Sequence, residues 1–442
     1  MPLTWARRTG PTTIVVLVVA LCAQWILQRP SGIATGSYIG QLLGAASILL
    51  LAIALVLIST LPFVEAWFDG IDRAAIWHRR VAIAGVALLI PHLALAQGDE
   101  GSTLGSPLAV VGVLGLGALV AWAMLPRWRF VVPGPLRGTI VALRDAPGIR
   151  EVRRLFGGYE RWRALHRTVG LFVAAGFVHG LLDGTPFDAA PALRWSYLAI
   201  GGVGLAFYVE RELLARWITP LHDYVVERVE QLGEGLVEIA LRPLGRRLEF
   251  VPGQWAMLYL EGKDGWHRHP FTIASAPQEH GLRVTVKALG DATARAHLVE
   301  PGMPAVLGGP HGRFDHRRGG PRQVWIAGGV GFTPFLSWVR AADLHPLPER
   351  VDFFYSGRGR PPFADEVEAV AARHPQLRVH LVDTTVQPRL TAESILAQAQ
   401  ARARDVSVFL CGPTPMLRAL QLQLRRAGVP GARLHREYFD WR

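Results

Sequence analysis

Residues 323–335, QVWIAGGVGFTPF, join an apolar strand to a glycine-rich loop and then to the start of a helix. We predict the strand over 323–327, the loop over 328–334 and a helix from Phe335 onward. Pro334 suits the first turn of a helix, because the N–H that proline lacks has no partner there in any case. A glycine loop in this strand–loop–helix order can present backbone N–H groups to nucleotide phosphates. These residues therefore predict an α/β domain that binds a nucleotide.

Two further apolar strands follow, and each ends in a short turn. We predict them over 351–355, before a Ser-Gly-Arg turn, and over 406–410, before a Cys-Gly-Pro turn. Open α/β sheets bind their ligands at the carboxyl ends of the strands. We therefore expect the three turns to contribute to one site.

The segment before this domain has the pattern of a small antiparallel barrel. Residues 225–241 and 255–260 alternate as strands do, with glycine-containing turns at 233–235 and 252–254. We place a linker at about 217–222 and the end of the barrel at about residue 320.

Three motifs lie within the predicted barrel. His269-Pro270-Phe271-Thr272 offers an aromatic face for a flat ring, with a hydroxyl beside it. After a strand over 282–288, a Gly-Asp-Ala-Thr turn at 290–293 opens a helix over 294–299; such a turn suits a pyrophosphate, or it is a plain capped helix with Thr293 as N-cap. The third motif, GPHGRF at 309–314, closes the barrel or forms only a turn.

The first 216 residues have the composition of a membrane protein. Half of the 442 residues are hydrophobic and only 19% are charged, and the mean hydropathy is +0.24. This composition excludes a disordered chain, and it makes the chain too apolar for an ordinary soluble enzyme of this size. The two cysteines cannot form a disulfide framework. Six stretches are suitable for spans, and they lie between residues 8 and 29, 29 and 65, 80 and 99, 100 and 127, 167 and 183, and 194 and 210.

The arginines predict how the chain crosses the membrane. The net charge is +12, but the arginines flank the spans, which disfavours a nucleic-acid partner. The loop over 126–164 holds nine arginines and three acids, whereas the loop over 97–103 is acidic. Since cytoplasmic loops carry the positive charge, we expect a multi-pass protein of the inner (plasma) membrane with both termini in the cytoplasm.

Four histidines lie in or beside the third and fifth predicted spans. His78 and His92 are 14 residues apart, so they share a helix face about 21 Å apart along the axis. His166 and His179 are 13 residues apart, which requires a locally tightened helix or different ring rotamers. Paired by depth, His78 with His166 and His92 with His179, they suit two six-coordinate haems.

A histidine hydrogen-bonded inside a helix bundle is the alternative for each of the four. Zinc is disfavoured, because neither depth offers a cysteine or carboxylate to complete a tetrahedral site. Arg79, Arg80 and Arg167 could pair with haem propionates or could simply anchor the spans at the interface.

In this order, the motifs resemble those of the ferric reductase / NADPH oxidase family. In that family a six-helix transmembrane dihaem domain is fused to a dehydrogenase of the ferredoxin-NADP reductase type. The resemblance covers essentially the whole chain. It implies a transmembrane dihaem domain over 1–216, an antiparallel β-barrel FAD domain over 217–320 and a Rossmann-like α/β NAD(P) domain over 321–442.

The resemblance also implies roles for individual residues. Phe271 would lie against the isoalloxazine of FAD, with the Thr272 hydroxyl near N5, and Thr293 would hold the pyrophosphate. Phe439 would cover the flavin until nicotinamide displaces it, with Trp441 as an alternative. The catalytic candidates are Thr272, Cys411 and Phe439. The cofactor-binding candidates are His269, Pro270, Phe271, Thr272, Lys287, Gly290, Thr293, Gly309, Gly328, Gly329, Gly331, Thr333, Pro334, Arg358, Cys411, Gly412, Pro413 and Phe439.

The implied activity is electron transfer from cytoplasmic NADPH or NADH, through FAD and two b-type haems, to an acceptor outside. The acceptor could be a ferric chelate, dioxygen, a quinone or a partner protein. Arg358 and Arg360 modestly favour NADPH, because they could bind its 2′-phosphate. The alternative is that they are two solvated surface arginines with no ligand. Two alternatives remain at this stage: a haem-free, membrane-anchored flavin reductase, and a transporter with a nucleotide-sensing domain.

Overall fold

The computed structural model describes residues 3–59, 61–96, 102–124, 159–214, 220–233, 235–262, 265–287 and 298–437. The chain divides into two compact units. One is Ala6–Ile218, and Thr219–Arg442 makes up most of the other.

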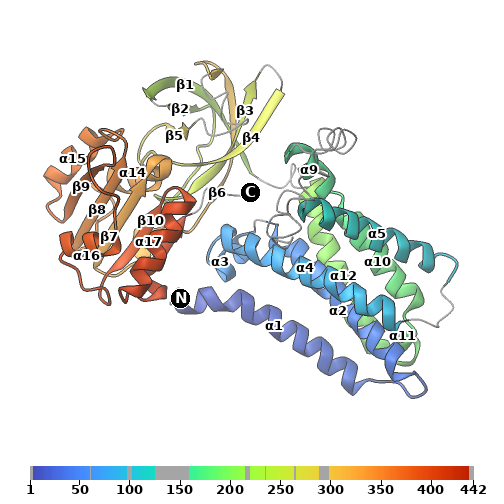
Figure 1. Ribbon diagram of the computed structural model, residues 1–442. Helices are drawn as coiled ribbons and strands as arrows, with labels where there is room; N and C mark the ends of the chain where they lie inside the picture. Colours follow the sequence, from blue (N-terminus) through green and yellow to red (C-terminus); the bar gives the residue numbers. More distant parts are fainter. Residues whose placement is uncertain are drawn as a thin grey trace, which may run out of the picture. The chain divides into compact units, whose positions relative to one another are not determined.

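Long apolar helices build the first unit (Figure 1). They are α1 (Leu3–Leu27), α2 (Thr35–Leu57), α4 (Ile71–Leu95), α5 (Gly105–Met124), α10 (Val169–Asp183) and α12 (Pro191–Val209). Shorter elements lie between or after them: α3 (Pro62–Phe68), α9 (Tyr159–His166), α11 (Pro186–Ala189) and the π-helical turn η3 (Glu210–Leu214). Among the described residues, six segments are long and apolar enough to cross a membrane, as the sequence predicts.

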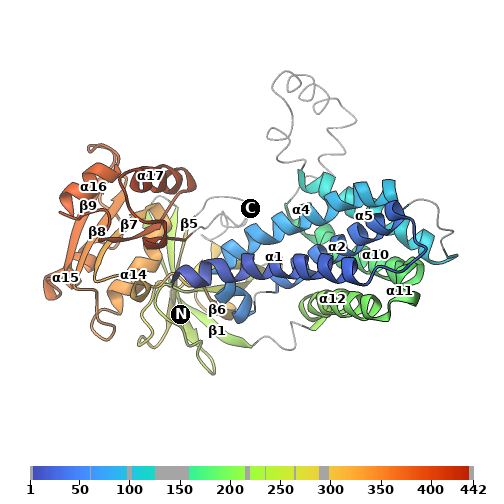
Figure 2. The ribbon, with the colours of Figure 1, turned by 90° about the horizontal axis from the view of Figure 1, so that it is seen from below.

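Helix α2 is the centre of this bundle. Its apolar window is 61% buried, whereas the windows of the other five segments are between 17% and 22% buried. α2 packs along α4 and α12, and α5 packs along α10 (Figure 2). Small residues permit the close contacts, since a Cβ on Gly204 would lie 2.5 Å from the Cβ of Ala52. The outer helices expose large apolar side chains such as Val16, Ile90 and Leu114.

The fifth segment is interrupted and tightened between its two histidines, which is one of the two possibilities that the 13-residue spacing left open. α9 ends at His166 and α10 begins at Val169. The N–H of Thr168 donates to the carbonyl of Leu165 over 3.0 Å, and the N–H of Leu171 donates to that of Thr168 over 3.0 Å. These i→i−3 bonds wind the chain more tightly than an α-helix. The tightening accounts for the 13-residue histidine spacing.

An antiparallel six-stranded sheet begins the second unit, in the order β4-β3-β6-β1-β2-β5. Its buried face is apolar and includes Val226, Ile239, Leu258, Val284 and Leu307. The strands are β1 (Leu221–Gly233), β2 (Leu236–Pro243), β3 (Trp255–Gly262), β4 (Gly265–Thr272), β5 (Leu282–Lys287) and β6 (Pro304–His311). This is the antiparallel domain that the alternating pattern predicts.

A parallel five-stranded sheet follows, in the order β11-β10-β7-β8-β9. From its first strand, β7, the chain first adds β8 and β9 on one side and then β10 and β11 on the other. Such a reversal of strand order is typical of the doubly wound class. Its strands are β7 (Arg322–Gly328), β8 (Arg350–Gly357), β9 (Leu377–Asp383), β10 (Ser407–Cys411) and β11 (Leu434–Glu437). Its helices are α14 (Thr333–Arg340), α15 (Ala364–Arg373), α16 (Ala392–Gln398) and α17 (Thr414–Arg426).

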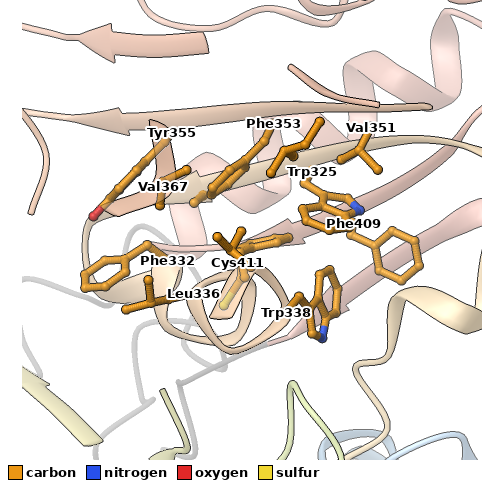
Figure 3. Packing of buried hydrophobic residues seen from close by; sticks show 14 of the residues in the cluster. Trp325, Phe332, Leu336, Trp338, Val351, Phe353, Tyr355, Val367, Phe409 and Cys411 are labelled. Atoms are coloured by element: carbon orange, nitrogen blue, oxygen red, sulfur yellow. The ribbon is translucent and has the colours of Figure 1, made fainter. Parts of the chain in front are cut away.

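Alternate residues of the parallel strands pack on opposite faces of the sheet. Trp325 and Phe353 point to the side covered by α14 and α15 (Figure 3). Val324 and Ile326 point to the side covered by α16 and α17. Because both faces are buried, these strands are apolar throughout.

The antiparallel and parallel sheets share one apolar interface. The ring of Phe314, after β6, stacks on Trp338 of α14 with centroids 4.9 Å apart. The Trp338 indole donates to the Pro252 carbonyl over 3.0 Å, and the Ser337 hydroxyl donates to the Ser275 carbonyl over 2.8 Å.

Candidate functional site

The carboxyl edge of the parallel sheet brings the predicted turns together. β7, β8 and β10 are neighbours in the sheet, so the turns after them lie at one edge. A Cβ on Gly331 would lie 2.4 Å from the carbonyl oxygen of Cys411. The φ angle of Gly412 is +159°, and a Cβ there would lie 3.1 Å from the Gly328 oxygen. The turn after β7 and the turn after β10 therefore interlock through glycines.

The loop after β7 is a short 3₁₀ turn, Gly329–Phe332, that continues directly into α14. Gly329 has a φ of +54°, which favours glycine, and no atom lies within 4 Å of where its Cβ would be. Thr333 is buried, and its hydroxyl donates to the Val330 carbonyl over 3.1 Å. Pro334 lies in the first turn of α14. The open space beside Gly329 would let a ligand approach the backbone of the loop that precedes this helix.

Cys411 has no exposed surface, and its side chain lies among apolar core residues such as Phe332 and Leu336 (Figure 3). Burial, with a smaller effect from the charge of Glu437, raises the pKa of the Cys411 thiol well above its usual value. The thiol of Cys411, a catalytic candidate from the sequence, is therefore a neutral packing group in this structure. At this turn the described structure offers the backbone of Gly412 and Pro413 instead.

The two candidate phosphate-binding arginines lie in the turn after β8 and differ in their ion-pair partners. Arg360 is held by Asp365 and Glu368, whose carboxylates accept hydrogen bonds from its guanidinium. Arg358 is exposed and, within the part of the chain that the structure describes, forms no ion pair. Of the two, Arg358 is the one whose charge remains available to an incoming phosphate.

The predicted flavin-contacting residues end strand β4. Phe271 lies opposite Ala256 of β3, and its ring is 6.4 Å from that of His269. Thr272 is 6% exposed, and its Oγ1 has no hydrogen-bond partner among the described residues. A buried hydroxyl without a partner is costly, so this atom fits a ligand that supplies one. Pro270 completes the motif in the same strand.

Two further cofactor candidates lie in described parts of the antiparallel domain. Lys287 ends β5, and Gly309 lies in β6 with a φ of +131°. Three candidates lie outside the described residues: Gly290, Thr293 and Phe439, together with the alternative Trp441.

In the helical unit the four histidines form two pairs. The ring centroids of His78 and His166 are 6.2 Å apart, and those of His92 and His179 are 6.4 Å apart. α4 and α10 make little backbone contact with each other in the described structure. The rings of His92 on α4 and His179 on α10 thus approach each other across two helices that are not closely packed, and His78 of α4 faces His166 at the end of α9.

These separations suit one metal ion between each pair of rings. A histidine nitrogen binds a transition metal at about 2 Å, and about 1 Å separates that nitrogen from its ring centroid, so two axial imidazoles have centroids about 6 Å apart. The described residues contain no cluster of three or more His, Cys, Asp or Glu side chains that could hold a metal ion. Two nitrogen ligands per site suit haem iron, because the porphyrin supplies the remaining four.

Hydrogen bonds at Nδ1 orient three of the four rings. His78 Nδ1 lies 2.8 Å from the Ala54 carbonyl, and His92 Nδ1 lies 2.8 Å from the Gly40 carbonyl. His179 Nδ1 lies 3.1 Å from a carboxylate oxygen of Asp183. Since these acceptors require a proton on Nδ1, each Nε2 is left as the metal-binding atom.

The fourth ring is positioned by stacking. Trp162, one turn earlier in α9, lies parallel to His166 with centroids 4.9 Å apart. The Nδ1 of His166 is buried and has no hydrogen-bond partner in the described chain. Of the arginines predicted to meet propionates, Arg167 pairs with Glu212 at 2.5 Å and Arg80 lies over Trp77.

The sequence reasoning overlooked two residues that shape the His92–His179 pair. Asp183 lies four residues after His179, the spacing that puts two side chains on one helix face. Gly44 of α2 makes room for the other ring, because a Cβ there would lie 2.9 Å from His92. The His-x-x-x-Asp spacing was a usable signal, whereas the role of Gly44 depends on tertiary packing.

Comparison with known proteins identifies the second unit. Residues 223–301 match a family model described as an FAD-binding domain, and residues 325–421 match an oxidoreductase NAD-binding domain. Together these two domains form what we call the reductase module. The helical unit matches neither of these two models.

The relatives are similar only in part. A flavohemoprotein from Burkholderia sp. (strain TH2) is 30% identical over 249 residues, which are 52% of this chain and 62% of that protein. The glycine betaine monooxygenase reductase subunit of Chromohalobacter salexigens is 30% identical over 210 residues, which are 43% of this chain and 56% of that protein. The chain thus spans about three fifths of the length of these relatives.

One solved structure is similar over most of the chain. It is the flavohemoglobin from Malassezia yamatoensis with bound FAD and heme, with a TM-score of 0.50 and 18% identity over 92% of this chain and all of that one. At this identity the likeness concerns the fold alone.

Proposed function

We propose that the protein is a transmembrane oxidoreductase that passes electrons from cytoplasmic NADPH or NADH to an acceptor on the other side of the membrane. In this proposal 1–216 form the dihaem domain, 217–320 the FAD domain and 321–442 the NAD(P) domain. When bound, FAD supplies the conversion of a hydride into single electrons, and two b-type haems supply a one-electron path across the bilayer.

The observation that carries the proposal is the pairing of the four histidines. Two pairs of imidazoles, with centroids 6.2 and 6.4 Å apart, occur in apolar segments that are long enough to cross a membrane. Histidine is costly in a membrane span, and where it occurs there it usually has a function. The ligand pairs are His78 with His166 and His92 with His179.

The reductase module supplies the source of electrons. The unpartnered hydroxyl of Thr272 would donate to or accept from the flavin ring, and Phe271 would contact its face. The interlocked turns at Gly331 and Gly412 would hold the nicotinamide nucleotide by their backbone. Arg358 would bind a 2′-phosphate, which favours NADPH over NADH.

The placement of arginines supports the direction of transfer. The loop rich in arginine lies largely in 125–158, outside the described residues, but its charge favours the cytoplasmic side. The His92–His179 pair then faces the outer leaflet of the inner membrane. A ferric chelate, dioxygen, a quinone or a partner protein would receive the electrons there.

A spectrum of the purified full-length protein tests this proposal. After dithionite reduction we expect paired b-type bands, with two haem irons and one FAD per chain. A protein that oxidises NAD(P)H normally but has only flavin absorbance would contradict the dihaem proposal and favour a haem-free reductase. Solute flux without NAD(P)H oxidation would favour a transporter.

A further inference from the structure

The four histidines differ in the charge of the group that holds Nδ1. The partners of His78 and His92 are neutral backbone carbonyls, at 2.8 Å each. The partner of His179 is the carboxylate of Asp183, at 3.1 Å. The His92–His179 pair is therefore supported by an anion, whereas His78 has a neutral partner.

Asp183 is itself held in one place. Its Oδ1 accepts the backbone N–H of Ser102 over 2.9 Å, and Ser102 Oγ in turn accepts the N–H of Gly105 over 2.9 Å. Gly105 begins α5, and the N-terminus of a helix carries partial positive charge that favours an anion. A Cβ on Gly105 would lie 2.2 Å from the Asp183 carboxylate, so the carboxylate rests against this backbone.

The other pair has a different electrostatic environment. Arg167 and Arg211 both pair with Glu212, at 2.5 and 3.5 Å, near the end of α9 that carries His166. The negative charge of Glu212 is thus compensated by arginines. The side chain of Asp183, by contrast, is only 11% exposed. Among the described residues it contacts one histidine and the N-terminal end of one helix, and it has no arginine partner.

We propose that Asp183 is the positioning residue that sets the reduction potential of the haem at the His92–His179 site. This rests on the proposed function. A carboxylate that accepts a hydrogen bond from Nδ1–H makes the imidazole a stronger electron donor through Nε2. A stronger donor and a nearby fixed anion favour ferric over ferrous iron, and so lower the potential. The couple concerned takes up one electron per iron, and no bond to the protein breaks.

This assignment refines the type of acceptor. An outer site of lowered potential releases its electron to acceptors that are themselves hard to reduce. One-electron acceptors of low potential, such as ferric chelates or dioxygen, fit such a site better than acceptors of high potential.

The test is an optical redox titration of the full-length protein, in which two one-electron waves report the two haems. Asp183→Asn keeps the size of the side chain and removes its charge. Loss of such a partner changes metal affinity by about 10- to 100-fold. A tenfold change in the ratio of ferric to ferrous affinity raises one wave by about 59 mV, and the other wave stays in place.

Asp188→Asn is the matched control, because Asp188 is an exposed acid of α11 on the same side of the bundle. It should leave both waves unchanged. Two haems per chain with no shift in Asp183→Asn would overturn the role of Asp183 and leave the proposed function standing. A wild-type protein without haem would instead overturn the proposed function.

A conservative variant resolves the case in which Asp183→Asn loses the second haem. Asp183→Glu keeps the negative charge. Recovery of the haem with a potential near that of the wild type would support the assignment. If both variants lose the haem equally, the charge does not determine the site and the assignment is overturned.

Discussion

The candidate site of the helical unit is made of side chains, whereas that of the reductase module is made largely of backbone turns. In the helices, a few polar side chains stand in an apolar background, and each of the four histidines is surrounded by groups that orient it. In the module, glycine turns at the ends of β7 and β10 interlock so closely that a Cβ on Gly331 would lie 2.4 Å from a backbone oxygen. We conclude that removing a side chain breaks the first kind of site, whereas adding one breaks the second.

The largest effect is expected from removing one histidine of the helical unit. His92→Ala or His179→Ala should remove about half of the bound haem, because in the proposed arrangement these two histidines would together hold one of the two haems. Haem and iron are counted per chain in the purified variant. His222→Ala, at a half-buried histidine of the reductase module, should keep both haems. Unchanged haem in both variants of the helical unit would contradict the ligand assignment.

The converse experiment adds a side chain to the module. Gly331→Ala should lower kcat/KM for NAD(P)H by about 10- to 100-fold, since overpacking costs about 1–3 kcal/mol. Steady-state kinetics measure this loss, while FAD content should hold. Gly245→Ala is the control, because no atom lies within 4 Å of its Cβ position. Wild-type kinetics in Gly331→Ala would show that the turn can yield.

Within the module, the loss of one buried arginine should lower the free energy of unfolding strongly. Arg340 of α14 is 4% exposed and pairs with Glu238 of β2 at 3.2 Å and with Glu366 of α15 at 2.6 Å. Arg340→Met removes the nearer of the two arginines that face Glu238, which is 2% exposed, and leaves only Arg283, whose guanidinium lies 3.9 Å away. Breaking a buried pair costs about 3–5 kcal/mol, which denaturation followed by flavin release can measure.

The exposed pair made by Arg360 with Asp365 and Glu368 serves as the control for that experiment. Arg360→Met should change the stability little, because solvent screens exposed ion pairs. Equal losses in the two variants would mean that burial does not determine the effect of Arg340.

Acidification should weaken the same network. Burial acts to raise the pKa of Glu366, but the hydrogen bonds and charge of Arg340 outweigh it and hold the pKa below its usual value. Because the folded-state pKa is the lower one, the stabilisation is present above about pH 4.3 and is lost as the pH falls through the folded-state value.

Thermal unfolding of the wild type and of Glu366→Gln between pH 6 and pH 3.5 measures this effect. The gap in Tm between the two proteins should narrow toward the acid end. A gap that is constant over the whole range would contradict the role of the carboxylate.

The smallest effect is expected at Arg358, where an exposed side chain acts on a ligand. Arg358→Ala should raise KM for NADPH about fivefold and leave KM for NADH unchanged, because an exposed ion pair contributes at most about 1 kcal/mol. The ratio of the two KM values measures it. An equal change for both nucleotides would assign Arg358 a role other than binding the 2′-phosphate.

Much of the fold could be predicted from local pattern. The strand predicted over 323–327 is β7, Arg322–Gly328, and the strand predicted over 351–355 is β8, Arg350–Gly357. Such strands are readable because both faces are buried and the runs are apolar. The pairing of the histidines followed from helix periodicity at His78 and His92, where 14 residues are nearly four whole turns.

Other features depend on tertiary contacts and could not be predicted. The break between α9 and α10 rests on hydrogen bonds around Thr168, whose side chain also donates to the Leu165 carbonyl over 2.7 Å. The burial of Cys411 follows from how closely the Gly331 turn approaches it. Asp183 reads in the sequence as the end of a span, and only its contacts with His179 and Ser102 give it a further meaning.

Electron transfer into sealed vesicles tests the central claim most directly. The full-length protein is placed in liposomes that enclose ferricyanide, and NADPH is added outside to the molecules whose reductase module faces outward. The account predicts that the enclosed ferricyanide is reduced by the wild type and not by His92→Ala or His179→Ala. Normal NADPH oxidation with no reduction of enclosed ferricyanide by the wild type would contradict it.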